Sequence, residues 1–277
     1  MNWKRLILFW LVVILTGILM LALLQHRMIY HPRSYGSIYQ PFLNDSLQKI
    51  SYQTPEGSQT AFYQPPSEGN PPKAIWILFG GNAALALDWM WLVEQSAGSD
   101  FGFLLIDYPG FGECEGSASP ESILASSKAA WEHWQELYAN QRTPQIGILG
   151  HSLGAAAALQ LAETISVERV VLLSPFTSVA DMVKKMFGSW LIPLLKHRFE
   201  NRGPLMQLLK RDPPPSITII HGTRDEVIPV EMGRELAAIN SEHIHYHELI
   251  HSYHNTILQD ALPMVLQELQ SIRKLSD

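Results

Sequence analysis

Short apolar runs alternate with longer segments of helical spacing through most of the chain. The runs Ala74–Phe79 and Phe101–Ile106 are typical of strands buried on both faces of a sheet. Before them, Leu47–Thr54 and Gln59–Gln64 predict a hairpin. A further strand is expected to end at residue 150, and others are expected at 169–174, 216–220 and 243–249. Helices are expected at 83–97, 120–140, 155–158, 232–239 and 255–275. This alternation predicts an α/β fold whose mostly parallel sheet is covered by helices on both faces.

The amino end carries a different pattern. Leu6–Leu24 is an uncharged run of 19 residues, with Lys4 and Arg5 before it. As a helix it would be about 28 Å long, close to the thickness of the hydrocarbon core of a bilayer. The run is long for a cleaved signal peptide, and no convincing cleavage site follows it. We therefore expect a membrane anchor over residues 1–26, a polar connector over 25–41 and a folded domain within 27–277.

The charges around the anchor do not decide its orientation. Arg27 and Arg33 on one side balance Lys4 and Arg5 on the other. The short free amino terminus favours an orientation with the folded domain on the non-cytoplasmic side. In either orientation the sequence predicts a single-pass membrane protein.

Composition narrows the range of functions. The chain has 277 residues, 47% of them hydrophobic, which is enough for one α/β domain with a well-buried core. The formal net charge is −6 and no basic cluster stands out, which argues against a nucleic-acid partner. Cys114 is the only cysteine, so no intrachain disulfide can form. These features do not predict the oligomeric state.

One motif organises the expected chemistry. An apolar run ends in Gly150-His151-Ser152-Leu153-Gly154, and an alanine-rich segment suited to a helix follows it. Between a strand and a helix, G-x-S-x-G places the serine on a sharp turn with its hydroxyl exposed. A plain glycine-rich turn with a surface serine would not need a strand before it and a helix after it. Ser152 is therefore the expected nucleophile.

A serine nucleophile needs a base, and the base needs an orienting carboxylate. In this arrangement the acid and then the base follow the serine along the chain, each at a strand end. Asp225 follows the strand at 216–220 and is the expected acid. His254 stands directly before the last helix and is the expected base, with His251 of the same loop as its rival. The rival acids are Glu226, Asp181 and Asp212.

Attack on a carbonyl also requires donors for the oxyanion, normally two backbone N–H groups. One is expected from Leu153, directly after the nucleophile. The other is expected from Asn82 in the loop Gly80-Gly81-Asn82-Ala83, which follows the strand Ala74–Phe79. Glycines in this loop would let its backbone approach a substrate closely.

Three histidines, His243, His245 and His247, alternate along a predicted strand and therefore share one face. Such spacing permits a metal site, but no carboxylate or cysteine clearly completes one. A solvated strand face is the simpler interpretation. We expect neither a metal nor a cofactor.

On these motifs the chain resembles the α/β-hydrolase superfamily, and more narrowly the membrane-anchored, bud-emergence-type (ABHD-like) serine hydrolases. The resemblance extends from about Arg27 to the carboxyl end. It implies an α/β-hydrolase fold, a catalytic triad of Ser152, Asp225 and His254, and Asn82 and Leu153 as oxyanion donors. The motifs that carry it lie at 79–83, 107–112, 150–154, 175–178, 221–229 and 254–255.

Several positions depart from the family pattern. Gly80 stands where the family usually has a histidine, which leaves the expected oxyanion loop with less support. Pro109 and Cys114 stand in place of the usual arginine and serine, and Thr256 replaces a common aspartate. None of these changes removes a catalytic group.

The segment 178–210 lies between two strands and is expected to form a short helical cap insertion. Its apolar side chains suggest an acyl pocket, although packing onto the main domain accounts for many of them. Together with the anchor, an acyl pocket indicates lipid-like or long-chain acyl substrates. These side chains are Met182, Val183, Met186, Phe187, Trp190, Leu191, Leu194 and Leu195.

The expected activity is hydrolysis of carboxylic ester or thioester bonds through an acyl-enzyme on Ser152, with a small acyl or lipid molecule as substrate. Two alternatives remain, because one fold hosts many functions. A serine peptidase of the prolyl-aminopeptidase type would share the fold and the triad. A non-catalytic binding protein would keep the fold alone, and the presence of serine, acid and histidine in the expected order argues against it.

Overall fold

The computed structural model describes residues 3–43, 46–66, 71–96, 98, 100–139 and 144–272. Within these residues an eight-stranded sheet runs through the domain in the order β1-β2-β4-β3-β5-β6-β7-β8. The strands are β1 (Gln48–Thr54), β2 (Gly57–Gln64), β3 (Ala74–Phe79), β4 (Phe101–Ile106), β5 (Gln145–His151), β6 (Arg169–Leu173), β7 (Ser216–Gly222) and β8 (Ile244–Leu249).

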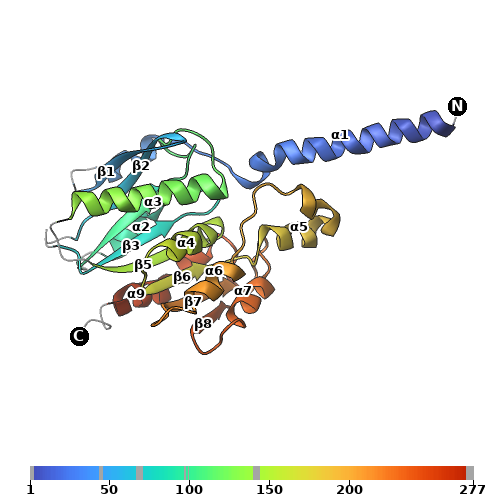
Figure 1. Cartoon of the computed structure of the whole chain (residues 1–277). Coiled ribbons are helices and arrows are strands. Elements are labelled where there is room, and N and C mark those ends of the chain that lie inside the picture. Colours follow the sequence, from blue (N-terminus) through green and yellow to red (C-terminus); the bar gives the residue numbers. More distant parts are fainter. Residues whose placement is uncertain are drawn as a thin grey trace.

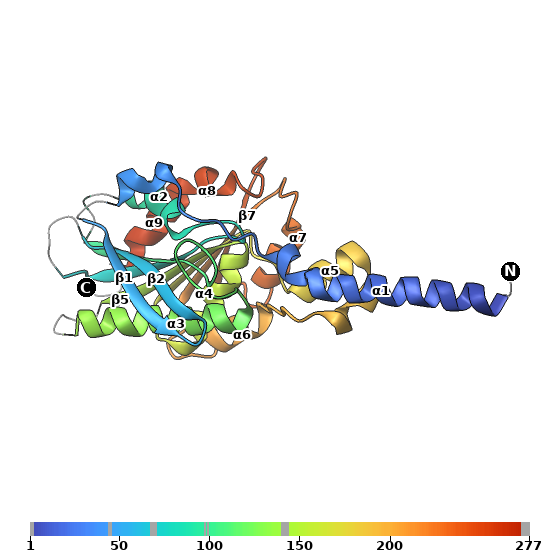
Figure 2. The ribbon, with the colours of Figure 1, turned by 90° about the horizontal axis from the view of Figure 1, so that it is seen from above.

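The sheet is mostly parallel, as predicted. β2 pairs antiparallel with both β1 and β4, and every later pairing from β4 to β8 is parallel. Figure 2 shows α3, α4 and α6 on one face and α2, α8 and α9 on the other. The helices of the domain are α2 (Met90–Gln95), α3 (Pro120–Leu137), α4 (Leu153–Thr164), α5 (Val179–Phe187), α6 (Arg202–Leu208), α7 (Val230–Ala237), α8 (Ile257–Asp260) and α9 (Leu262–Ser271).

The core follows the two central apolar strands. Every residue of β3 and of β4 is buried, which explains why the sequence marked them as continuous apolar runs. The indole of Trp76 on β3 fills the space that a side chain at Gly147 on β5 would need. Close packing across neighbouring strands fixes their carboxyl ends at one edge of the sheet.

Two predicted helices differ in detail. Instead of one helix at 83–97, the 3₁₀ turn η2 (Ala86–Trp89) precedes α2. The Asp88 carboxylate accepts the Leu85 N–H at 2.8 Å and thereby closes that first turn locally. The last predicted helix is divided into α8 and α9 around Ala261. The predicted ends at Ala97, Asn140 and Leu275 lie outside the described residues.

The amino-terminal helix α1 (Trp3–Ile29) is longer than the predicted anchor. The expected connector at 25–41 is therefore wrong over residues 25–29, and the boundary between 26 and 27 falls inside a helix. The segment Trp3–Met20 of α1 is long and apolar enough to cross a membrane, and none of it is buried. The helix projects away from the domain (Figure 1).

The insertion at 178–210 contains α5, the 3₁₀ turn η3 (Ser189–Leu194) and α6. Ser178 begins α5, because its hydroxyl accepts the Asp181 N–H at 2.9 Å. Gly188 ends α5 with a φ of +88°, a conformation that favours glycine. Figures 1 and 2 both show α5 beside the carboxyl-terminal turns of α1.

Candidate active site

Ser152 occupies the turn between β5 and α4. Its backbone has a φ of +57° and a ψ of −118°, a strained conformation that costs about 1–3 kcal/mol. A Cβ on Gly150 would overlap the backbone of Gly154, and a Cβ on Gly154 would overlap the carbonyl oxygens of Phe79 and Gly80. Only glycine therefore fits at positions 150 and 154. The resulting sharp turn directs the Ser152 side chain away from the carboxyl end of β5.

The structure brings together the three side chains that the sequence selected. Ser152 Oγ lies 3.0 Å from Nε2 of His254. The other ring nitrogen of His254, Nδ1, lies 2.8 and 3.0 Å from the two carboxylate oxygens of Asp225. Serine and histidine are 102 positions apart in the sequence, and the parallel sheet places their loops at one edge.

Asp225 is held as a carboxylate. Burial raises its pKa, but hydrogen bonds from His221, from His254 and from the Ile228 N–H outweigh burial and hold the pKa well below its usual range. Its Oδ1 accepts the N–H groups of Val227 at 3.0 Å and Ile228 at 2.7 Å. The loop after β7 thus orients a negative charge towards the histidine.

The partners of His254 define where its protons can be. A carboxylate only accepts hydrogen bonds, so Nδ1 carries the proton directed at Asp225. In the neutral ring Nε2 is then an unprotonated acceptor, and it faces the Ser152 hydroxyl. This arrangement can take a proton from the serine.

The rival residues have other partners. The Glu226 carboxylate accepts the backbone N–H of His254 at 3.2 Å. Asp181 accepts hydrogen bonds from Ser178 and Arg202 within the cap. In the described part of the chain, the ring of His251 makes no hydrogen bond with Ser152 or Asp225.

The loop after β3 lies beside the serine. A Cβ on Gly81 would be 3.7 Å from Ser152 Cβ, so this backbone approaches the nucleophile closely. Among the described residues, neither the N–H of Asn82 nor that of Leu153 has a hydrogen-bond acceptor. Both groups are therefore available to an oxyanion, which is the role that the sequence predicted for them.

Several contacts support this loop in the absence of the family's histidine at position 80. The Tyr108 hydroxyl donates to the carbonyl oxygen of Gly80 at 2.6 Å. The Asn82 side chain donates to the carbonyl oxygen of Ile29 at 3.0 Å, and the His31 N–H donates to that of Asn82 at 2.9 Å. The loop is thus supported by Tyr108, Ile29 and His31, to which the sequence analysis assigned no role in the site.

Two buried histidines near the site were also missed. His151 Nε2 lies 3.0 Å from the carbonyl oxygen of His254, so it donates to the loop that carries the expected base. Burial, and to a smaller extent the nearby His254, lower the pKa of His151 to about 4. His221 Nε2 lies 3.3 Å from the Asp225 carboxylate. Their positions in the sequence could have pointed to both histidines, since His151 directly precedes Ser152 and His221 is the first residue of the motif that contains Asp225.

Cys114 and Thr256, which depart from the family pattern, both form hydrogen bonds in the structure. The Cys114 thiol is buried and donates to the Thr60 carbonyl oxygen at 3.4 Å, and burial raises its pKa to about 12. It is therefore a poor nucleophile at neutral pH. The Thr256 hydroxyl donates to the Asp260 carboxylate at 2.8 Å.

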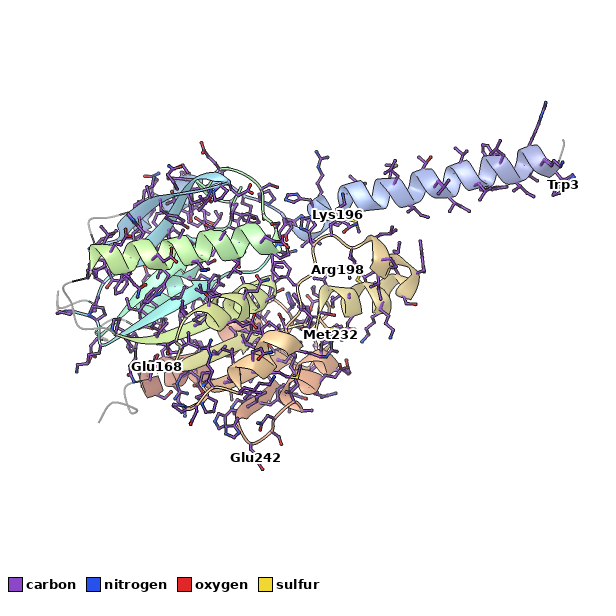
Figure 3. The ribbon with its side chains drawn as sticks, in the orientation of Figure 1. Trp3, Glu168, Lys196, Arg198, Met232 and Glu242 are labelled. Atoms are coloured by element: carbon purple, nitrogen blue, oxygen red, sulfur yellow. The ribbon has the colours of Figure 1, made fainter. Side chains whose placement is uncertain are left out.

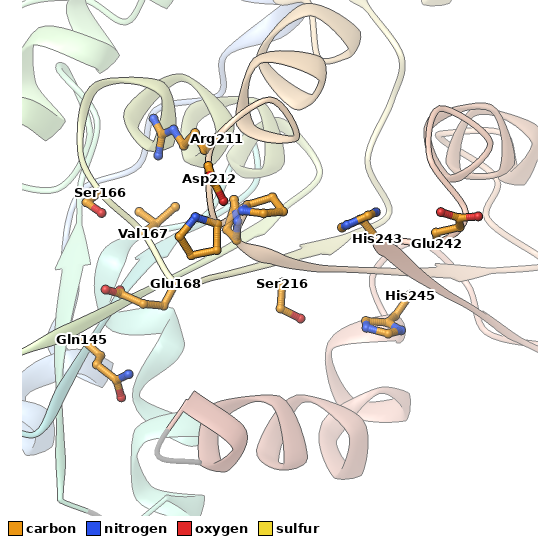
Figure 4. Close-up of a pocket in the computed structure, with 13 residues that line it drawn as sticks. Gln145, Ser166, Val167, Glu168, Arg211, Asp212, Ser216, Glu242, His243 and His245 are labelled. Atoms are coloured by element: carbon orange, nitrogen blue, oxygen red, sulfur yellow. The ribbon is translucent and has the colours of Figure 1, made fainter. Parts of the chain in front are cut away.

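A separate open cavity of about 880 Å³ lies at the opposite edge of the sheet (Figure 4). It is lined by the amino ends of β5 and β7, by Asp212, and by His243 and His245. Ligands of parallel sheets bind at the carboxyl ends of the strands, where Ser152 lies instead. Within the described residues, no group of three His, Cys, Asp or Glu side chains is placed to hold a metal ion.

Comparison with known proteins agrees with this architecture. A family model described as "Alpha/beta hydrolase family" matches residues 77–217. The chain is 29% identical over 222 residues to an uncharacterized protein of Mycobacterium tuberculosis, covering 79% of this chain and 76% of that protein. It is 24% identical over 189 residues to the protein bem46 of Schizosaccharomyces pombe, covering 67% of this chain and 57% of that protein.

A solved structure extends the comparison to the fold. An esterase of Pyrococcus furiosus superposes with a TM-score of 0.66 and 16% identity, covering 88% of this chain and 98% of that chain. At this identity the similarity concerns the fold alone. It agrees with the α/β architecture described above.

Proposed function

The chain belongs to the alpha/beta hydrolase family, and we propose that it is a serine hydrolase that cleaves carboxylic ester or thioester bonds. The observation that carries the proposal is the position of His254 between Ser152 and Asp225. Its Nε2 is 3.0 Å from the hydroxyl oxygen, and its Nδ1 is 2.8 Å from the nearer carboxylate oxygen. A buried serine in a strained turn, with a base and an oriented acid, is suited to nucleophilic catalysis.

In the proposed acylation step, His254 takes the Ser152 proton while the serine oxygen attacks the carbonyl carbon. Asp225 holds the ring in the required tautomer and stabilises the positive charge that develops on it. The C–O or C–S bond to the leaving group then breaks, and His254 returns the proton to the leaving oxygen or sulfur. An acyl group remains on Ser152 Oγ.

Deacylation repeats these roles with water. His254 removes a proton from a water molecule that attacks the acyl-enzyme, and the serine leaves with that proton. In both steps the carbonyl oxygen becomes an oxyanion, which the N–H groups of Asn82 and Leu153 would stabilise. The free state of both donors and the closeness of the Gly81 backbone to Ser152 support this assignment.

We also propose that α1 anchors the enzyme in a membrane and that the substrates are lipid-like or long-chain acyl compounds. The apolar segment Trp3–Met20 supports the first part. The apolar cap beside α1 supports the second, since Val183, Phe187 and Leu191 line a small apolar cavity between the cap and α1. A lipid substrate would then be close to the bilayer that supplies it.

The test uses the full chain in detergent micelles with matched oxygen ester, thioester and peptide substrates of short and long acyl chains. The proposal predicts turnover of an ester or a thioester that Ser152→Ala abolishes, with higher kcat/KM for the longer acyl chains. Turnover of the peptide alone would replace the proposal by a serine peptidase. Equal hydrolysis of short and long acyl esters would contradict the lipid-like substrate class.

A further inference from the structure

We propose that the cap carries a membrane-docking edge, formed by Met28, Met186, Phe187 and Trp190, that inserts into the interfacial layer of an anionic phospholipid bilayer. The inference rests on the proposed anchoring by α1. It adds a second contact with the bilayer, made by the domain itself. The cap would thereby be held at the membrane surface.

The four side chains of the docking edge are apolar and exposed. Met186 is 64% exposed, Trp190 60%, Met28 50% and Phe187 45%. Met28 and Phe187 line the same small apolar cavity, so the edge is continuous from α1 to the cap. Large apolar side chains that gather on one exposed edge mark a contact with a membrane or a protein.

Contacts between α1 and the cap fix this edge relative to the anchor. The Gln25 side chain donates to the Leu194 carbonyl oxygen at 2.7 Å and accepts the Lys196 N–H at 2.8 Å. The buried Tyr30 hydroxyl lies 3.3 Å from Nδ1 of His197. These hydrogen bonds tie residues 194–197 of the cap to the carboxyl-terminal turns of α1.

The length of α1 places the docking edge at the right depth. The uncharged run ends at Leu24, and Met28 is four residues further along the same helix, a rise of about 6 Å. The interfacial layer on one side of a bilayer is roughly 5–8 Å thick. If Leu6–Leu24 spans the hydrocarbon core, Met28 and the cap beside it lie in that layer. Tryptophan is enriched at this depth.

The charges around the edge select the kind of lipid. Lys184 is exposed on α5, Arg27 on α1 and Lys196 on the cap, whereas the exposed Lys185 is paired with Glu231 at 3.8 Å. Figure 3 shows Lys196 and Arg198 where the cap meets α1. Acidic side chains of the cap are partly neutralised, as Asp181 is paired with Arg202 at 2.6 Å. Cations around an apolar edge complement anionic headgroups.

The experiment places a fluorophore at single sites of the full chain in vesicles. Cys114 is the only cysteine, so Cys114→Ser provides a background into which Trp190→Cys, Val13→Cys and Leu137→Cys are introduced separately. Val13 reports on α1, and the exposed Leu137 at the end of α3 is the matched control. Each site carries an environment-sensitive dye, and quenching is measured with lipids that bear a nitroxide near the top of the acyl chain, with lipids labelled near the end of the chain added for Val13→Cys.

We expect the dye at Trp190→Cys to lose most of its emission and the dye at Leu137→Cys to lose little. Adding phosphatidylglycerol to phosphatidylcholine vesicles should increase the quenching at Trp190→Cys. Quenching at Val13→Cys with only control-level quenching at Trp190→Cys would overturn the docking edge and leave the anchor intact. Absence of quenching at both sites would overturn the docking edge together with the anchor.

A second cap position guards against a local folding defect. Met186→Cys alters another exposed side chain of the same edge, so it should reproduce the quenching of Trp190→Cys. Control-level quenching at both cap positions, in protein that keeps the wild-type circular dichroism spectrum, contradicts the docking edge.

Discussion

The side-chain amide of Asn82 donates a hydrogen bond to the backbone carbonyl oxygen of Ile29 at 3.0 Å. Ile29 is the last residue of α1, and Asn82 supplies one of the proposed oxyanion donors. Arg33, just after α1, adds a further contact by donating to the carbonyl oxygen of Ala83 at 3.1 Å. The end of the proposed anchor thus supports the loop that Gly80 would otherwise leave weakly held.

Asn82→Ala keeps the backbone N–H of residue 82 but removes the side-chain hydrogen bond to the Ile29 carbonyl oxygen. We expect kcat to fall by about 10- to 100-fold, less than the loss of a whole oxyanion donor, with KM nearly unchanged. Asn240→Ala is the matched control, because Asn240 lies in the loop before β8 and, among the described residues, its side chain bonds only to Glu242 and His243. Steady-state kinetics in detergent micelles measures both, and an unchanged kcat in Asn82→Ala would contradict the support role.

Asp225→Asn should reduce kcat by about 10⁴-fold, because an amide no longer holds His254 in the tautomer that accepts the serine proton. Glu226→Gln is the control from the adjacent position. Its amide oxygen can still accept the His254 N–H, so activity should remain near the wild-type level. Loss of activity in Glu226→Gln with retention in Asp225→Asn would reverse the assignment of the acid.

Asp107→Asn tests the pH dependence of stability. Burial raises the pKa of Asp107 from 3.8 to about 7, and its oxygens accept the Ala86 N–H and the Tyr35 hydroxyl. Between pH 4 and 7 the folded state retains a proton that the unfolded state has released. Ionisation of Asp107 therefore removes stability as pH rises through this range.

The measurement for Asp107 is thermal unfolding of wild type and variant at several pH values. The wild type should lose stability relative to Asp107→Asn between pH 4 and 7, by up to about 1.4 kcal/mol per pH unit. Above pH 7 the difference should level off. Parallel curves across the whole range would show that Asp107 titrates normally.

Gly154→Ala should destabilise the fold by about 1–3 kcal/mol or more, because its methyl group would overlap backbone oxygens that cannot move aside. Gly203→Ala in α6 is the matched control. There a Cβ would meet only the flexible Glu200 carboxylate, so the substitution should be neutral or slightly stabilising. Chemical unfolding of both variants checks the difference, and equal stabilities would contradict the close approach of β5 and α4.

Local patterns predicted much of the fold. The bounds of β3 and β4 agree with the apolar runs because these strands are buried on both faces, so each position in them is apolar or glycine. Ser152, Asp225 and His254 could be selected because each follows a strand at its carboxyl end, and parallel strands align these ends.

Contacts between distant segments could not be predicted in this way. Gln25 is a polar residue at the end of an apolar run, and its hydrogen bond to the Leu194 carbonyl oxygen of the cap joins segments that are far apart in the sequence. The contact of His151 with the carbonyl oxygen of His254 joins residues 103 positions apart. A backbone acceptor has no sequence signature, so the pattern around His151 could not identify its partner.

Covalent labelling with a fluorophosphonate tests the central claim, an activated Ser152, most directly. Wild type and Ser152→Ala are treated in the membrane fraction, and the modified peptide is identified by mass spectrometry. The account predicts one adduct on Ser152, formed quickly in the wild type, much more slowly in Asp225→Asn and not in Ser152→Ala. A folded wild type that is not labelled, or that is labelled equally in Ser152→Ala, would contradict it.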